Sequence, residues 1–442
     1  MRRLPLITLL AAASACQGYV AVPVTPVTLV AVEQRTTVRV ATKADVLLVV
    51  DDSASMSGKQ DRLAAALSTF TSQLDALEPP VDYQVAVTTT SVAERLGACG
   101  PAGDPNAAGQ CDSDWQAAGF ACDTKLACFR TFTEAGQFHQ AGTAPAILPR
   151  ASFTPQQFAQ LLAGNVQVGT AGSRQPQGME AMKVALTSTP GQQFLRDGAK
   201  VVVAFFTDAE DCSDPNHRLS MLTKDPATGN IVDRCAQETE PGFTGTPSLE
   251  PVANYVNFLR GLKNLDGSPK EVEIGAVVSL TDGTSDPGVC SNPSCDAQCD
   301  SQAQTDACNA RCQDAPTFAI CVSDCISTCH SFCGGQVPGR RYLELAFSFS
   351  GQVANVCSDD AGPALGQLSQ VIGIPKQVNL RTAPSPSNLL VVRVHRGAQD
   401  ILCNLGDGYD LVPTAQGQAV HFDGACVLQP NDTYDIRYLT AK

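Results

Sequence analysis

Oxygen-bearing side chains gather directly after a short aliphatic run near the start of the chain. Residues 46–50 read Val-Leu-Leu-Val-Val, and Asp51, Ser53 and Ser55 follow at alternate positions. The run predicts a buried parallel strand that ends at a loop, and open α/β sheets bind ligands beyond the carboxyl ends of their strands. On such a loop, the Asp-x-Ser-x-Ser spacing can turn one carboxylate and two hydroxyls toward a common point. Oxygen ligands of this kind suit Mg²⁺, Mn²⁺ or Ca²⁺ better than zinc.

Two other loops are candidates to contribute to the same site. Residues 201–206 form a second buried-strand run, which leads directly to Thr207 and Asp208. Residues 168–173, Val-Gly-Thr-Ala-Gly-Ser, precede the helical pattern of residues 178–186.

The opening stretch resembles the von Willebrand factor A family, whose metal ion-dependent adhesion site begins with Asp-x-Ser-x-Ser after the first strand. The resemblance covers roughly residues 45–372 and implies an α/β fold, a Rossmann-like domain with a central, mostly parallel sheet flanked by helices. The family completes its site with a Thr from a second loop and an Asp from a third, which here implies Thr170 and Asp208. Ser173 is an alternative to Thr170, because more residues separate Thr170 from the helix than the family usually has. Asp52 stands where the family usually has Gly, so it could perturb the site or simply face water.

Hydrophobic periodicity predicts the elements that position these loops. The run at 271–280 has the character of a further buried strand, and 341–346 resembles the closing strand of the family. Helices are expected at 59–78, 154–162, 177–186, 249–262 and 364–372, and a second strand at 83–88.

Two acidic residues follow Asp208 in the third loop. Glu210 and Asp211 could extend the metal site, but such neighbours are more often solvated loop carboxylates, and we do not count them among the ligands. His217 has no second His at ligand spacing, so we interpret it as a surface histidine.

Length and charge limit the possible functions. The chain has 442 residues, a formal net charge of −14 and 43% hydrophobic residues. The length predicts about three structural units, and the hydrophobic fraction indicates a chain that buries a core. The acidic balance argues against a nucleic acid partner, because affinity for phosphates depends on Lys and Arg.

The N-terminus has the pattern of an export signal. Two arginines precede an apolar run over residues 4–15, whose last small residues lead into Cys16. This resembles a bacterial lipoprotein signal, cut before a Cys that becomes lipidated; a plain secretory signal cut near Ala15 is the alternative. The run is too short to span a bilayer, so we expect attachment to the membrane through lipid on Cys16. A Gln rather than an Asp at position 17, directly after Cys16, resembles the pattern of lipoproteins bound for the outer membrane. We therefore expect the protein in the bacterial cell envelope.

Cysteine usage agrees with an oxidising compartment. The chain has 19 Cys, and setting Cys16 aside leaves an even number that can pair as disulfides. Cys212 and Cys235 are expected to close one insertion. The insertion at about residues 288–336 holds repeated Cys-x₃-Cys pairs. These pairs predict a disulfide-pinned helical hairpin or small bundle rather than a metal–thiolate cluster. That insertion has an odd number of Cys, so one must pair outside, and Cys357 is a candidate.

These features predict an ordered series of segments. A signal peptide (1–15) precedes a lipid-anchored tether (16–43), in which residues 36–41 could add an edge strand. The von Willebrand factor A-type domain (44–373) is interrupted by Cys-bearing insertions at about 97–149, 212–246 and 288–336. A small β-rich domain (374–442) follows, with strands at 388–395, 420–422 and 434–438 and with Cys403 and Cys426 as its expected disulfide.

The family resemblance predicts an adhesion or envelope scaffolding protein. It implies that a Mg²⁺ (or Mn²⁺ or Ca²⁺) ion keeps an open position, which an acidic side chain of another protein fills. We expect no small-molecule substrate and no catalytic activity. A metal-dependent hydrolase is the alternative, although residues 51–53 lack a second acid two residues after the first and the five His lie in no nucleophile motif. A purely structural envelope protein with a degenerate metal site is the third interpretation.

Overall fold

The structure is a computed structural model of the chain. It describes residues 29–37, 42–77, 80–98, 116–117, 119–122, 127–216, 223–224, 231–232, 234–281, 288–292, 297–313, 322, 337–349, 351–372, 377–380, 382–385, 389–414, 417–429 and 432–441. The predicted export signal, Cys16, His217 and most of the expected Cys-rich hairpin lie outside the described residues.

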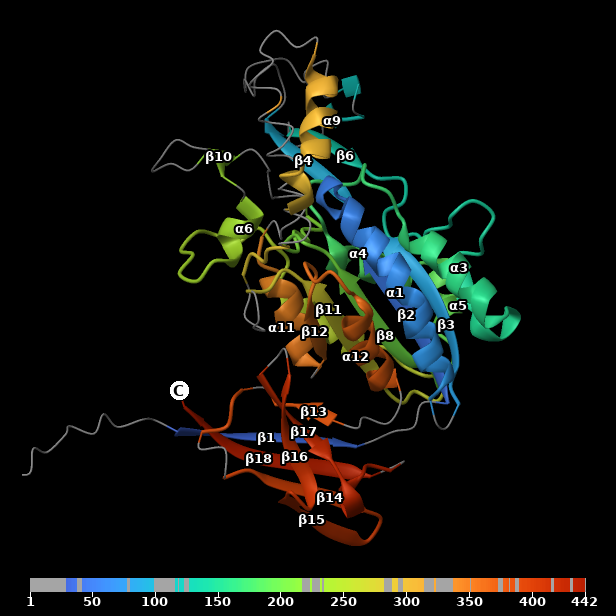
Figure 1. The fold of residues 1–442 in the computed structure, drawn as a ribbon, viewed down its shortest axis with the longest axis vertical. Coiled ribbons are helices and arrows are strands. Elements are labelled where there is room, and N and C mark those ends of the chain that lie inside the picture. Colours follow the sequence, from blue (N-terminus) through green and yellow to red (C-terminus); the bar gives the residue numbers. More distant parts are fainter. Residues whose placement is uncertain are drawn as a thin grey trace, which may run out of the picture.

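A six-stranded, mostly parallel sheet forms the centre of the larger domain (Figure 1). The strand order is β12-β11-β8-β2-β3-β7, and all neighbours are parallel except β3 and β7. The strands are β2 (Lys43–Val50), β3 (Asp82–Thr89), β7 (Ile147–Pro149), β8 (Lys200–Phe206), β11 (Val272–Val278) and β12 (Gln352–Asn355). The predicted α/β fold with a central, mostly parallel sheet is confirmed.

Helices cover both faces of this sheet. Because side chains alternate along a strand, Val46 and Leu48 of β2 face one helical layer and Leu47 and Val49 face the other. The first layer contains α1 (Ser57–Asp75), α3 (Pro155–Val166) and α12 (Gly362–Ile372), and the second contains α4 (Gly178–Thr187), α5 (Thr189–Phe194), α7 (Val252–Arg260) and α11 (Arg340–Ser348).

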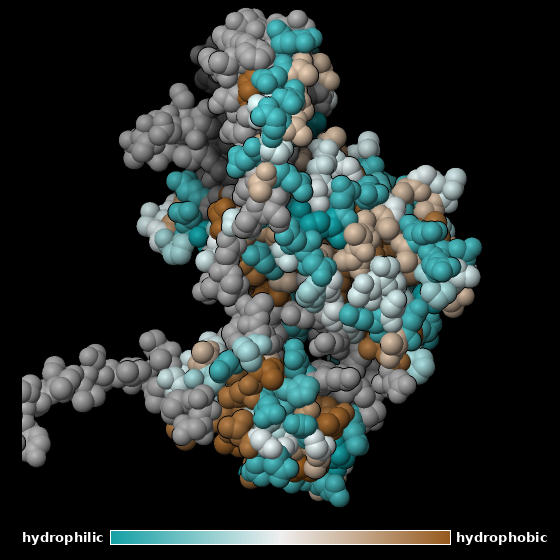
Figure 2. All heavy atoms as spheres, viewed as in Figure 1, coloured by the Kyte–Doolittle hydropathy of each residue, from teal (hydrophilic) through white to brown (hydrophobic). Residues whose placement is uncertain are grey.

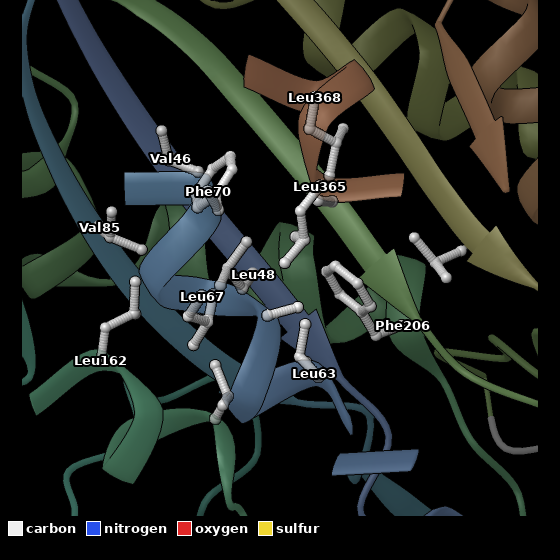
Figure 3. Close-up of a cluster of buried hydrophobic side chains, with 14 of the residues drawn as sticks. Val46, Leu48, Leu63, Leu67, Phe70, Val85, Leu162, Phe206, Leu365 and Leu368 are labelled. Carbon is white, nitrogen blue, oxygen red and sulfur yellow. The ribbon is translucent and has the colours of Figure 1, made fainter. Parts of the chain in front are cut away.

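Helix α1 packs its apolar stripe directly onto the sheet. Leu63, Leu67 and Phe70 recur at three- and four-residue spacing and are at most 2% exposed. Figure 3 shows them beside Leu48 of β2 and Leu365 of α12. This packing fixes the start of α1, and with it the loop that carries the Asp-x-Ser-x-Ser motif.

One predicted element has a different type in the structure. Residues 341–346, expected as the closing strand, lie inside helix α11, and β12 closes the sheet instead. The reason is visible in the burial of Tyr342, Leu345 and Ala346, which follow helical spacing onto the second face of the sheet.

Smaller elements lie in the insertions or next to them. Strands β4 (Ala93–Ala98), β6 (Ala127–Thr131) and β5 (Ala121–Cys122) form a three-stranded antiparallel sheet. Strands β9 (Thr223–Lys224) and β10 (Ile231–Val232) pair with each other. Helices α6 (Arg234–Thr239) and α9 (Gln302–Cys312) belong to the second and third predicted insertions.

The C-terminal β domain is a seven-stranded sheet that also takes in an N-terminal segment. Strand β1 (Leu29–Thr37) pairs antiparallel with β18 (Thr433–Ala441) along its whole length (Figure 1). The tether was predicted over residues 16–43 with an edge strand at 36–41, and within the described residues the edge strand covers residues 29–37. The order is β1-β18-β14-β15-β16-β17-β13, with β13 (Gln377–Asn379), β14 (Val391–Arg396), β15 (Gln399–Leu405), β16 (Gly408–Thr414) and β17 (Gly417–Phe422).

Three predicted disulfides are present. Cys212 pairs with Cys235 and Cys403 with Cys426, and Cys290 of the third insertion reaches outside it to Cys357. Cys122, Cys128, Cys299 and Cys308 are also disulfide-bonded, so none of them is a thiolate ligand. Within the described residues, no helix is both long enough and apolar enough to cross a bilayer.

Candidate metal centre

The Asp-x-Ser-x-Ser loop and the Asp208 loop leave neighbouring strands at the same edge of the sheet. Val50 of β2 is level with Phe206 of β8 in the parallel register, and the Asp51 N–H donates to the Phe206 carbonyl at 2.9 Å. Asp51 and Asp208 therefore emerge side by side from the carboxyl ends of adjacent strands. This is where ligands collect in open α/β sheets.

Asp51 is fully buried and held by several donors. Its Oδ1 accepts from the Ser53 N–H at 2.8 Å and from the Thr90 hydroxyl at 3.3 Å, and its Oδ2 accepts from the Thr207 hydroxyl at 2.5 Å. Burial raises the pKa of Asp51 to about 7, and the negative charge of Asp208 adds to the rise. A cation at this carboxylate would relieve both effects.

Ser53 and Ser55 connect Asp51 to Asp208. The two serine hydroxyls lie 3.3 Å apart, and the Ser55 hydroxyl donates to Asp208 Oδ1 at 2.8 Å. The buried Lys59 ammonium donates to the other oxygen, Asp208 Oδ2, at 2.8 Å and to the Ser55 carbonyl at 2.9 Å. The structure thus brings Asp51, Ser53, Ser55 and Asp208 together in one continuous polar cluster.

The second loop lies against the first, but its two candidate ligands differ. Gln60 donates to the carbonyls of both Asp51 and Gly169 at 2.8 Å, which places Thr170 at the rim of the cluster. The Thr170 side chain is exposed and makes no hydrogen bond in the structure. Ser173 is buried, and its hydroxyl bonds to the backbone of Ala93 and Gln175, so it organises the loop rather than facing Asp51.

Asp52 does not face water. It is 6% exposed, and its Oδ1 accepts from the hydroxyls of Ser91 at 2.7 Å and Thr90 at 3.3 Å. Its carbonyl accepts from the Gly172 N–H at 2.8 Å. A Cβ at Gly172 would lie about 2.2 Å from the Asp52 carboxyl carbon, so only glycine allows this close approach.

Thr90 is the site residue that the sequence did not indicate. It follows β3, is fully buried, and its hydroxyl lies 3.3 Å from one oxygen of Asp51 and 3.3 Å from one oxygen of Asp52. The available signal was the run Thr88-Thr89-Thr90-Ser91 at the end of the second predicted strand. This run alone does not indicate a partner, and only the pairing of β3 with β2 brings Thr90 beside Asp51.

Glu210 and Asp211 are buried structural groups, not solvated loop carboxylates. Glu210 accepts from the backbone N–H groups of Arg340 and Arg341 at the start of α11, and burial raises its pKa to about 7. Asp211 accepts from the Met179 N–H at the start of α4 and from the Arg341 guanidinium. Both carboxylates therefore satisfy helix N-termini, which are favourable positions for negative charge.

The donor set fits a hard divalent cation. Two buried carboxylates, two serine hydroxyls and the Thr90 hydroxyl offer only oxygen ligands, which Mg²⁺, Mn²⁺ and Ca²⁺ prefer. The adjoining Asp52 adds a third buried carboxylate, so one Lys59 ammonium does not balance the charge of the cluster. Among the residues described by the structure, no three His, Cys, Asp or Glu side chains form a metal-holding group, so this centre depends on hydroxyls as well as carboxylates.

Solved structures of two other proteins align with this chain. A von Willebrand factor type A protein from Catenulispora acidiphila aligns over 93% of this chain and 65% of its own length, with 8% identity and a TM-score of 0.30. The pilus adhesin SpaC from Lactobacillus rhamnosus GG aligns over 94% of this chain and 41% of its own, with 11% identity and a TM-score of 0.26. The chain thus spans less than two thirds of either protein. No family model and no curated protein matches the sequence.

The fold follows from the chain's own sheet and helices. Five parallel strands, an antiparallel edge strand β7 and helices on both faces are all present. The Asp-x-Ser-x-Ser loop leaves the carboxyl end of a central strand of that sheet. The larger domain is therefore an α/β domain with a central, mostly parallel sheet covered by helices on both faces, which is the fold that the resemblance to the von Willebrand factor A family implies.

Proposed function

We propose that the protein binds another protein through a Mg²⁺-type ion at this centre and acts in adhesion or scaffolding in the cell envelope. Asp51, Ser53, Ser55 and Asp208 would hold the ion, with a hydroxyl from Thr90 or Thr170. The observation that supports this most is the hydrogen-bonded connection from Asp51 through Ser53 and Ser55 to Asp208. When bound, the ion supplies a Lewis-acidic position for a carboxylate oxygen of the partner.

The residues of the chain prepare the site for such a ligand. Thr207, Thr90 and the Ser53 N–H fix both oxygens of Asp51, so its carboxylate needs little rearrangement. Ser53 and Ser55 are only partly buried, which leaves the solvent side of the cluster open to a partner.

We propose that the protein acts outside the cytoplasm. Disulfides in both domains support this, because they persist in oxidising compartments. Lipidation at Cys16, with an outer-membrane location, is the finer proposal. It is tested by metabolic labelling with a fatty acid, comparing the wild type with Cys16→Ala.

The test of partner binding is a pull-down from envelope extracts with purified protein. We expect capture in Mg²⁺ to be lost in EDTA, in Asp51→Ala and in Ser53→Ala, because each removes the ion or one of its ligands. Ser72→Ala is the matched control, since Ser72 is exposed near the far end of α1. Capture that persists in EDTA or in Asp51→Ala would refute the mechanism.

The proposal assigns no catalytic role to the site. The competing metal-dependent hydrolase is tested with the same protein, by following phosphate or peptide release in Mg²⁺. Release that depends on Asp51 would favour the hydrolase over the adhesion protein.

A further inference from the structure

Lys59 places a basic side chain inside the proposed metal centre. Its side chain is 1% exposed, and its ammonium lies 2.8 Å from Asp208 Oδ2 and 2.9 Å from the Ser55 carbonyl. Lys59 lies in the first turn of α1, where the helix dipole disfavours a cation. Its contacts with Asp208 and Ser55 compensate for that unfavourable position.

The two oxygens of the Asp208 carboxylate have different hydrogen-bond partners. Oδ2 accepts a hydrogen bond from the Lys59 ammonium, whereas Oδ1 accepts one from the hydroxyl of Ser55, which is itself a candidate ligand. One oxygen of Asp208 is therefore available to the ion or to its bound water, and the other is already neutralised. The Asp208 carboxylate therefore attracts the ion less strongly than it would without the Lys59 ammonium.

The positive charge of Lys59 has opposite effects on the binding of the divalent ion and on the binding of the partner's carboxylate. A divalent cation is repelled by the ammonium, while the carboxylate of a partner is attracted by it. With Lys59, the three carboxylates of Asp51, Asp52 and Asp208 leave a formal charge of about −2, which one divalent ion cancels. Without Lys59 the loaded site would stay negative and would repel an acidic partner.

We infer that Lys59 is a positioning residue that weakens the binding of the divalent ion and strengthens the binding of an acidic partner to the loaded site. This inference rests on the proposed function, because it concerns the ion and the acidic ligand of the same centre. It adds the reason why a buried lysine belongs there. The charge of Lys59 lowers the affinity of the site for the ion and raises the affinity of the ion-loaded site for an acidic partner.

The experiment measures both affinities in the same variants. Lys59→Gln keeps a hydrogen-bond donor near Asp208 but removes the charge, and Lys59→Met removes both. Binding of Mn²⁺ is followed by electron paramagnetic resonance, and binding of immobilised poly-L-glutamate is measured in saturating Mg²⁺. Lys43→Met is the matched control, because Lys43 is an exposed lysine at the opposite end of β2.

We expect Mn²⁺ affinity to rise and poly-L-glutamate affinity to fall, each by roughly tenfold or more in Lys59→Gln, from the Coulomb energy of one charge at contact range. Lys59→Arg, which keeps the charge, should stay near the wild type in both. Should Lys59→Met fail to fold, Lys59→Gln and Lys59→Arg still decide the question.

The possible results separate the inference from the proposed function. A fall in both affinities in Lys59→Gln would mean that Lys59 only supports the structure, and unchanged affinities would mean that its charge is irrelevant; either overturns the inference. Wild-type protein that binds no Mn²⁺ would overturn the proposed function itself.

Discussion

Thr90 and Thr207 donate hydrogen bonds to the buried Asp51 carboxylate and so stabilise it before any ion is bound. A fully buried carboxylate is costly unless donors surround it, and these two hydroxyls with the Ser53 N–H supply three hydrogen bonds. The remaining cost appears as a pKa for Asp51 of about 7. At the residue scale the centre is therefore a set of prearranged oxygens with excess negative charge.

The two candidate threonines should respond differently to loss of the hydroxyl. Thr90→Val removes a donor shared by two buried carboxylates, so we expect the free energy of unfolding to fall by about 1–3 kcal/mol. Thr170→Val removes an exposed hydroxyl without partners and should change it by less than about 0.5 kcal/mol. Denaturant unfolding in EDTA measures both.

A titration with Mg²⁺ on the same variants identifies the ligand. The variant with the weaker Mg²⁺ affinity, measured by calorimetry, names the threonine that the ion contacts. Equal stability of the two variants in EDTA would contradict the hydrogen bonding of Thr90.

At the scale of elements, the two ends of the parallel sheet are secured in different ways. The end that carries the metal centre is held by hydroxyls and by the Glu210 and Asp211 contacts with the starts of α11 and α4. The opposite end is held by Arg196, whose guanidinium lies 2.7 Å from the buried Asp45 of β2 and 2.9 Å from Asp82 of β3. Loss of Arg196 would leave the Asp45 charge buried without its main partner.

Arg196→Met should destabilise the protein more at neutral pH than at an acid pH near the ordinary pKa of an Asp carboxyl. Burial already raises the pKa of Asp45, and Arg196 opposes that rise, so the variant raises the pKa further. A carboxyl whose folded pKa is raised stabilises the fold at low pH, and this contribution is lost as the pH rises through the folded pKa. We expect a loss of about 3–5 kcal/mol when Asp45 is charged, and a smaller loss when it is protonated.

Urea unfolding at the two pH values measures this difference. Arg393→Met is the control, because its partner Asp400 is 53% exposed and surface pairs contribute at most about 1 kcal/mol. A loss in Arg196→Met that is equal at both pH values would contradict the role given to Asp45.

At the scale of the whole molecule, a strand near the start of the chain pairs with the last strand of the chain. Strand β1 precedes the α/β domain, yet it forms the edge of the C-terminal sheet beside β18, and β14 pairs with the other side of β18. Hydrophobic residues are visible on the surface of that domain (Figure 2), and Val391, Leu402 and Leu405 are between 43% and 57% exposed. Both the entry to and the exit from the α/β domain are thus anchored in the β domain.

Deleting residues 29–37 should expose one side of β18. We expect the β18 amides that bond to β1 to exchange hydrogen faster, while those that bond to β14 stay protected, because only the first set loses its acceptors. Hydrogen exchange resolved by NMR measures this. Deleting residues 17–28 alone is the control, and uniform protection of β18 after the longer deletion would contradict the pairing.

The sequence predicted the parts of the site that follow directly from strand ends. Asp51 and Asp208 each come after a buried-strand run, so their proximity follows once both strands lie in one parallel sheet. Lys59 also had a signal, because it lies four residues before Leu63 on the buried stripe of α1, where a lysine needs a partner. That signal is weak on its own, since periodicity says nothing about which carboxylate is near.

Other contacts depend on pairings across long stretches of chain. Glu210 meets the start of α11 about 130 residues later, and Gln34 of β1 meets Tyr438 of β18 across 404 residues. Local pattern cannot fix such partners, because register is set by packing of the complete sheet. This is why the edge strand was predicted at residues 36–41 rather than 29–37 and why Glu210 and Asp211 were predicted to be solvated, whereas the fold class was predicted correctly.

The most direct test of the central claim is anomalous diffraction from crystals grown with Mn²⁺. We predict one strong peak within about 2–2.5 Å of the Asp51 carboxylate and the Ser53 and Ser55 hydroxyls, with Asp208 beside it. The peak should be absent from Asp51→Ala crystals grown in the same way. A wild-type crystal at saturating Mn²⁺ with no peak there, or with its peak among other side chains, would contradict the account.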